Sequence, residues 1–130
     1  MINKPLDAVK KFHETYGLGV SKDPVASLGK AKNLLRFNLM KEENEEYLAA
    51  ANANDLIEVA DALGDMLYIL CGTMLEHGMQ NKIEEVFDEI QSSNMSKLGE
   101  DGKPIYREDG KVLKGPNYFK PNIAQFFEKK

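Results

Sequence analysis

The sequence has a single cysteine, Cys71, no long apolar run and no excess of positive charge. One cysteine excludes an intrachain disulfide, so nothing indicates an oxidising compartment, and its apolar neighbours predict a small buried side chain. The longest nearly uninterrupted apolar run covers residues 66–75, well short of the ~20 residues that a membrane helix needs. Residues 1–10 carry charges and no apolar core, unlike a secretory signal peptide. These absences predict a cytoplasmic protein with no membrane partner.

The charge balance and the missing motifs exclude further classes of protein. The chain has 17 basic and 21 acidic residues, for a net charge of -4. Proteins that bind nucleic-acid polymers do so through a basic face, so no such partner is expected. The sequence also lacks a Gly-x-x-x-x-Gly-Lys phosphate loop, and no Ser-His-Asp or Cys-His arrangement indicates a nucleophilic enzyme.

Helical periodicity accounts for most of the chain up to residue 97. The 130 residues fit one domain, which we expect to cover residues 1–130. Asn54 or Asp55 is placed to cap the third helix, and His77 and Gly78 are placed to end it. The fold class predicted is all-α, with a four-helix core over about residues 5–97. The four helices are expected over about 5–16, 25–51, 56–76 and 81–96.

The chain changes character at about residue 98, where glycine and proline become frequent. Residues 105–107 and 111–113 flank an Asp-Gly turn, which predicts a short hairpin. A short helix is expected near residues 123–128. We therefore expect a glycine-rich, basic tail over about residues 98–130 to follow the helical core.

The third predicted helix carries acidic residues on an otherwise apolar surface. Glu58, Asp61 and Asp65 follow each other at spacings of three and four, so they share one stripe of the helix. Acidic side chains are almost never fully buried unless they are paired. A helix this apolar belongs inside a fold, so its carboxylates need a partner.

The preceding helix supplies a second set of carboxylates. Glu42, Glu43 and Glu46 lie within about one turn of each other. The short connection at residues 52–55 makes the two helices antiparallel neighbours. Folding back at that connection brings Glu43 and Glu46 opposite the acidic stripe of the third helix.

A divalent cation is the simplest counter-charge for these carboxylates. No Lys or Arg occurs between residues 42 and 75, and like-charged carboxylates in contact repel one another. Oxygen ligands favour Mg, Mn or Ca over Zn, and no His or Cys is placed to make a zinc site. The alternative is a solvated acidic face, which we expect for Glu45 because it falls off the stripe. That alternative also applies to Glu42 taken alone.

These motifs resemble those of a known superfamily. Residues 42–46, Glu-Glu-Asn-Glu-Glu, and residues 58–61, Glu-Val-Ala-Asp, resemble the paired signature of the all-alpha nucleoside triphosphate pyrophosphohydrolases. That superfamily includes the MazG-like enzymes, the dimeric dUTPases and phosphoribosyl-ATP pyrophosphohydrolase. Arg36 and Leu39 are also similar to the helix of the family. Tail residues 93–116 are similar to a MazG-like branch close to the dimeric dUTPases.

The resemblance implies a MazG-like four-helix core that pairs as a homodimer or homotetramer. It implies Mg2+-dependent hydrolysis, with Mn2+ as a substitute, between the α and β phosphates of a nucleoside triphosphate, to give a monophosphate and pyrophosphate. Glu42 would be an outer ligand, or the group that orients or deprotonates the attacking water. Glu42 and Glu43 are thus the catalytic candidates, and Asp65 has no assigned role. The metal ligands implied are Glu43, Glu46, Glu58 and Asp61.

The tail carries a positive net charge, opposite in sign to that of the acidic residues of the second and third predicted helices. Residues 41–65 hold one basic and eight acidic side chains, whereas residues 97–120 hold six basic and four acidic side chains. Cations in the tail can bind phosphate oxygens, an amide can read a base edge, and an aromatic ring can stack on a base. The ordinary alternatives are solvated lysines and rings packed on the core. The substrate-binding candidates are Asn94, Lys97, Lys111, Lys114 and Tyr118, with Phe119 as an alternative to Tyr118.

Four readings of function follow from the sequence. The first is a pyrophosphohydrolase of a nucleoside triphosphate, with dUTP or another pyrimidine deoxynucleotide as the first candidate substrate. The second is a non-catalytic helical module that binds a metal or nucleotide for regulation. The third is phosphoribosyl-ATP pyrophosphohydrolase, which the glycine-rich tail disfavours. The fourth is a plain helical bundle with structural carboxylates.

Overall fold

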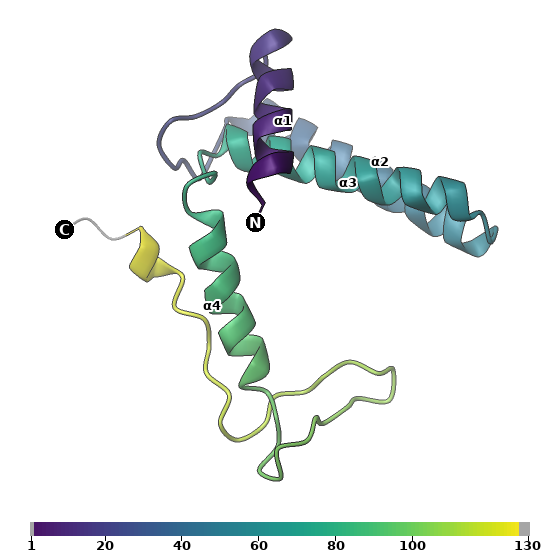
Figure 1. Cartoon of the computed structure of the whole chain (residues 1–130), viewed down its shortest axis with the longest axis vertical. Helices are drawn as coiled ribbons and strands as arrows, with labels where there is room; N and C mark the ends of the chain where they lie inside the picture. Colours follow the sequence, from purple (N-terminus) through teal and green to yellow (C-terminus); the bar gives the residue numbers. More distant parts are fainter. Residues whose placement is uncertain (1, 128–130) are drawn as a thin grey trace. The chain divides into compact units, whose positions relative to one another are not determined.

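The computed structural model describes residues 2–127 and contains four α-helices, which confirms the all-α class. None of the helices in this part of the chain is both long and apolar enough to cross a membrane. The chain separates into two compact units, one ending at Asn81 and the other beginning at Lys82. The single domain expected over residues 1–130 stays a prediction. The helices are α1 (Asn3–Thr15), α2 (Lys30–Asn52), α3 (Leu56–Glu76) and α4 (Ile83–Met95), followed by a short 3-10 turn, η1 (Ala124–Phe126) (Figure 1).

The helices α2 and α3 form an antiparallel pair that is the main element of the first unit (Figure 1). The connection between them is only three residues long and includes Asn54, which adopts a left-handed φ of 57°. Asp55 then caps α3, because its Oδ1 accepts a hydrogen bond of 3.1 Å from the Glu58 N–H. The bounds and the cap of α3 are therefore those that the sequence predicted.

The helix α2 begins at Lys30, about five residues later than expected. Residues before it form a loop that is held by the end of α3: the Val25 N–H donates to the His77 carbonyl at 2.9 Å. Gly29 has a φ of 93°, a left-handed conformation that a helix cannot continue through. Asn33 then bonds back to the loop, accepting from the Leu28 N–H at 2.8 Å. Contacts from a distant helix thus override the local helical pattern.

The buried apolar side chains of the first unit lie mainly where α1 packs on α3. Leu6 and Val9 of α1 are buried, as is Leu75 near the end of α3. Cys71 is completely buried, which confirms the prediction for the single cysteine. This core is small, and it fixes the C-terminal half of α3 against α1.

The second unit consists of α4 and the tail. Around the Asp-Gly turn, where the sequence predicts a short hairpin, the described tail contains one isolated antiparallel bridge between Tyr106 and Val112. Two backbone hydrogen bonds of 2.7 Å flank it, and the turn passes through Gly110 with a φ of 89°. The short helix expected near residues 123–128 is reduced to η1, and residue 128 lies outside the described residues.

Candidate active site

Glu43 is the centre of a cluster of carboxylates between α2 and α3. The side chain is half-buried, and its pKa is raised to about 6. Burial is the largest cause, because it penalises the charged form. The neighbouring Glu46 adds to the shift through a hydrogen bond and its negative charge, and Asp65 and Asp61 add theirs. The fold therefore brings together carboxylates from two helices, as the sequence predicted.

One oxygen of Glu43 has no partner in the described part of the chain. Its Oε2 is buried from solvent and makes no hydrogen bond there. A buried carboxylate oxygen left in this state is costly, because it has lost its hydration without gaining a donor or a cation. The atom is therefore placed to receive a positive ligand.

The other acidic candidates are less enclosed. Glu42 and Glu58 are exposed, and neither contributes to the pKa shift of Glu43. Asp65, to which the sequence assigned no role, is among the groups that do. Its spacing of four residues from Asp61 had already placed it on the acidic stripe of α3, but that spacing gave it no function.

The donor set fits magnesium by chemical type, since every candidate ligand is a carboxylate oxygen. The orphaned Oε2 of Glu43 supports a cation at this point. Over residues 2–127, however, no three or more His, Cys, Asp or Glu side chains converge closely enough to enclose a metal ion as they stand. The ligand set of Glu43, Glu46, Glu58 and Asp61 therefore stays a prediction.

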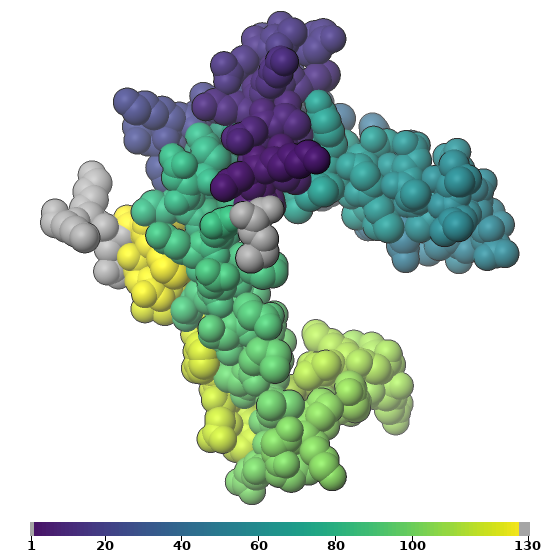
Figure 2. All heavy atoms as spheres, viewed as in Figure 1, coloured from purple at the N-terminus to yellow at the C-terminus, as the bar shows by residue number. Residues whose placement is uncertain are grey.

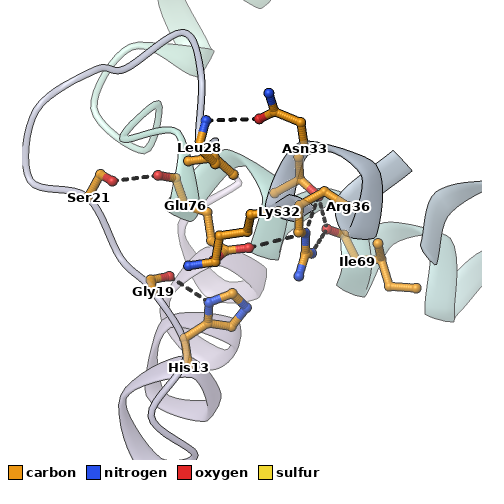
Figure 3. Close-up of polar contacts among 10 residues, drawn as sticks. His13, Gly19, Ser21, Leu28, Lys32, Asn33, Arg36, Ile69 and Glu76 are labelled. Carbon is orange, nitrogen blue, oxygen red and sulfur yellow. Dashed lines mark hydrogen bonds and ion pairs between the residues drawn. The ribbon is translucent and has the colours of Figure 1, made fainter. Parts of the chain in front are cut away.

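A buried ion-pair cluster fixes how α2 lies against α3, and the sequence did not reveal it. Arg36 is 7% exposed, and its Nη2 donates to the Ile69 carbonyl at 2.8 Å (Figure 3). Its Nε donates to Thr73 Oγ1 at 3.0 Å and lies 3.3 Å from Glu76 Oε2. Lys32 Nζ lies 2.9 Å from the other oxygen of Glu76. The sequence feature that could have indicated this cluster is Glu76, an acidic residue in the last turn of an apolar helix.

This cluster sets the register of the carboxylates. Arg36 and Glu43 are seven residues apart, about two turns along one row of α2. The row on α3 that Arg36 contacts continues at intervals of four, from Thr73 and Ile69 to Asp65 and Asp61. The bonds of Arg36 therefore align the row of α2 that carries Glu43 with the row of α3 that carries Asp61 and Asp65.

A glycine makes room for this cluster. A Cβ placed on Gly72 of α3 would lie 2.7 Å from His13 Nε2 and 2.8 Å from Arg36 Nη2. His13 is 3% exposed, and its Nδ1 lies 2.9 Å from the Gly19 carbonyl oxygen (Figure 3). His13 thus joins α1, the loop and α3.

The tail candidates all belong to the second unit. Lys114 Nζ lies 4.7 Å from the centre of the Tyr118 ring, within the range of a cation–π contact. Asn94 lies in the last turn of α4, and Lys97 follows the end of that helix. Lys111 lies just after the Asp-Gly turn, where its N–H donates to Asp109 Oδ1 at 3.1 Å. The structure brings Lys114 and Tyr118 together, and the roles of all five residues stay predictions.

The chain is similar to known proteins in three kinds of comparison. The family model described as phosphoribosyl-ATP pyrophosphohydrolase matches residues 9–94, which is more than half of the chain. An uncharacterised protein of Acanthamoeba polyphaga mimivirus is 50% identical over 38 residues, which are 29% of this chain and only 15% of that protein. A crystal structure of a candidate NTP pyrophosphohydrolase from Exiguobacterium sp. 255-15 is 24% identical, with a TM-score of 0.48 over 95% of this chain and 91% of that chain. The match that decides the family is the first.

Proposed function

Because the chain belongs to the phosphoribosyl-ATP pyrophosphohydrolase family, we propose that it is a Mg2+-dependent hydrolase that cleaves a nucleoside triphosphate to a monophosphate and pyrophosphate. The family match confirms the superfamily that the two acidic motifs indicated. It also supports the broader assignment to hydrolases that act on acid anhydrides. The metal, the nucleotide and the roles of the residues below belong to the proposal.

The observation that supports it most directly is the state of Glu43. Its Oε2 is buried without a hydrogen-bond partner in the described part of the chain, and burial together with three neighbouring carboxylates raises its pKa to about 6. A fold gains nothing in stability by gathering like charges in this way. Sites that bind cations and phosphates commonly hold groups whose pKa is shifted by such neighbours.

The proposed reaction is an attack by water on the α-phosphorus. The bond between that phosphorus and the oxygen bridging to the β-phosphorus breaks, and pyrophosphate leaves with that oxygen. The water loses a proton to a carboxylate, for which Glu42 and Glu43 are the candidates. With a pKa of about 6, Glu43 is largely ionised at neutral pH and close to the range that suits a general base.

The remaining carboxylates would hold the metal. Glu46, Glu58 and Asp61 are the proposed ligands together with Glu43, and Asp65 joins them as a neighbour of Glu43. Bound Mg2+ supplies the charge that lets a triphosphate approach several carboxylates, and it lowers the pKa of an attacking water. Lys97, Lys111 and Lys114 are proposed to bind phosphate oxygens, Asn94 a base edge and Tyr118 a base.

The substrate has two leading candidates. A pyrimidine deoxynucleotide, dUTP first, is favoured by the resemblance of the tail to the branch near the dimeric dUTPases. Phosphoribosyl-ATP is favoured by the description of the matching family. Both carry the α–β phosphate bond that the proposed reaction breaks, so the same acidic site serves either.

The test is a pyrophosphate-release screen with purified protein. The panel contains the ribo- and deoxynucleoside triphosphates, dUTP, modified bases and phosphoribosyl-ATP, each with Mg2+, Mn2+, Ca2+ or EDTA. We expect turnover of one substrate class that depends on Mg2+ and persists with Mn2+. Nucleotide binding without turnover would instead support the regulatory module. Neither binding nor turnover, with melting unchanged by Mg2+, would support a plain helical bundle.

A further inference from the structure

We propose that Ser93, Ser96 and Gly115 are positioning residues that lay the tail on α4 and so fix the side chains that grip the nucleotide. The inference rests on the proposed function, because it assigns a purpose to the tail of the same enzyme. All of the contacts that carry it lie within the second unit.

The two serines bind the backbone of one tail residue on both sides. Ser93 Oγ donates to the Phe119 carbonyl at 2.8 Å, and Ser96 Oγ accepts from the Phe119 N–H at 3.1 Å. Ser96 Oγ also donates to the Ser93 carbonyl at 2.5 Å, which fixes the orientation of that hydroxyl. Ser93 is 3% exposed, so its bond is shielded from water. Two serine side chains about one helical turn apart thus bind both the backbone N–H and the backbone carbonyl of Phe119.

Gly115 provides a second, independent attachment. A Cβ built on this glycine would lie 2.0 Å from the Leu98 carbonyl oxygen and 2.8 Å from the Lys97 carbonyl oxygen. No real side chain fits at those distances. The tail backbone therefore passes directly over the backbone that follows α4, and only glycine permits that approach.

Hydrogen bonds to backbone fix a direction that apolar packing alone does not. The Phe119 side chain is 45% exposed, so burial of its ring does not account for the attachment. One serine hydroxyl donates to the Phe119 carbonyl, and the other accepts from the Phe119 N–H. Together they determine which residue of the tail lies at this point of α4. A tail that only covered α4 would have no need of such a register.

The attached residues are the sequence neighbours of four candidate substrate ligands. Asn94 follows Ser93, Lys97 follows Ser96, Lys114 precedes Gly115, and Tyr118 precedes Phe119. The contact of Lys114 Nζ with the Tyr118 ring, 4.7 Å to its centre, joins the two residues that immediately precede the attached positions Gly115 and Phe119. The attachments thus determine where the cation of Lys114 and the ring of Tyr118 are presented together, and a nucleotide offers phosphates to the first and a base to the second.

The test compares serine variants that differ only in whether they touch the tail. Ser93→Ala/Ser96→Ala removes both hydroxyls, and Ser92→Ala, at an exposed neighbour on α4, is the matched control. We expect the double variant to raise KM for the best substrate of the panel about tenfold with kcat changed less than about threefold, because substrate binding is weakened and the carboxylates are untouched. The control should match the wild type.

Two further variants separate positioning from folding. Ser96→Thr keeps a hydroxyl, so its KM should stay close to that of the wild type. Gly115→Ala should raise KM about as much as the double serine variant does. Circular dichroism should show unchanged helix content in all of them. Hydrogen exchange at the Phe119 amide should be faster in Ser93→Ala/Ser96→Ala than in the Ser92→Ala control.

The outcomes distinguish this inference from the proposed function. A wild type that turns over a nucleotide, combined with wild-type KM in the folded double variant, would overturn the inference alone. A wild type that neither hydrolyses any panel member nor binds the α,β-imido analogue of dUTP would overturn both. A loss confined to kcat would also contradict it, since the tail would then act on the chemical step.

Discussion

At the scale of single residues, Glu43 shows most clearly what the fold has gathered. An exposed glutamate stays ionised well below neutral pH, whereas this one has a pKa of about 6. Burial and the charges of Glu46, Asp61 and Asp65 act in the same direction on it. The side chain is therefore held in an unfavourable charged state at neutral pH until a cation compensates it.

Neutral replacements of the carboxylates should abolish turnover. We expect Glu43→Gln and Asp61→Asn to lose at least about a hundredfold in kcat/KM, because each removes a charge that the metal and the attacking water need. The matched control is Glu45→Gln, at an exposed residue of the same helix whose carboxylate lies 3.8 Å from Lys41 Nζ. Pyrophosphate release measures all three. Full activity in both cluster variants would contradict the proposed metal site.

The activity should fall as the pH drops through about 6. Protonation of Glu43 removes a ligand and a base, so kcat/KM at low Mg2+ should decline below its pKa. Higher Mg2+ should move the midpoint to lower pH, because the cation competes with the proton. A pH–rate profile at two Mg2+ concentrations checks this. A profile that is flat from pH 5 to 7 at low Mg2+ would rule out a role for Glu43 ionisation.

The same pKa predicts how the metal-free fold responds to pH. The folded pKa of Glu43 lies above the ordinary value of 4.5, so the native state binds the proton more tightly than the unfolded state. The free energy of unfolding should therefore decrease as the pH rises from 4.5 through about 6. Urea unfolding in EDTA at both ends of that window should show a smaller decrease for Glu43→Gln than for the wild type.

At the scale of elements, the pairing of α2 with α3 determines whether the carboxylates meet. Arg36 bonds to the Ile69 carbonyl and Thr73 of α3 and lies beside Glu76. Burial lowers the pKa of the guanidinium, and the charge of Glu76 opposes that shift. A slip of the two helices would break these bonds and separate Glu43 from Asp61 at the same time.

Removing the buried cation should destabilise this pairing strongly. We expect Arg36→Met to lower the free energy of unfolding by about 3 kcal/mol, since the buried Glu76 loses one of the two cations that lie beside it in the described part of the chain. Arg107→Met is the matched control, because its ion pair with Asp109 is exposed to solvent and should contribute little to the free energy of unfolding. Urea denaturation measures both. Equal losses in the two variants would contradict a register-setting role for Arg36.

At the scale of the whole molecule, the α2–α3 pair leaves a large apolar surface uncovered in the first unit. Within this unit, α1 covers only the part of the pair near the end of α3, as Figure 2 shows. Monomeric proteins seldom expose large contiguous apolar surfaces. The large apolar side chains that are more than one third exposed on these two helices are Leu34, Leu35, Phe37, Tyr47, Leu48, Leu56, Ile57, Leu63, Leu67, Tyr68 and Leu70.

We therefore predict that the chain self-associates through this pair, as a dimer or tetramer. Light scattering at micromolar concentration should give a mass at least twice that of the 14.6 kDa chain. Leu34→Glu/Phe37→Glu places two charges on α2 and should lower the mass. Tyr106→Glu, at a 63% exposed residue of the tail, should leave it unchanged. A monomeric wild type would contradict the prediction.

The sequence by itself determined what depends on local interactions. Helical periodicity and the Asp55 cap defined α3 from Leu56 to Glu76, because both signals act within a turn of the helix. The same periodicity placed Asp61 on an acidic stripe and identified Cys71 as buried. The resemblance of the two acidic motifs to a known superfamily indicated the superfamily, which the family model confirmed.

Only the tertiary structure decided what depends on residues far apart in the chain. The loop before α2 is held by backbone bonds to the end of α3, so local propensity misplaced the start of that helix. Burial against another helix, which no local pattern shows, raised the pKa of Glu43 and enclosed Arg36. The bonds of Ser93 to Phe119 likewise span 26 residues. Such contacts form only when the chain is folded, because distant segments must first be brought together.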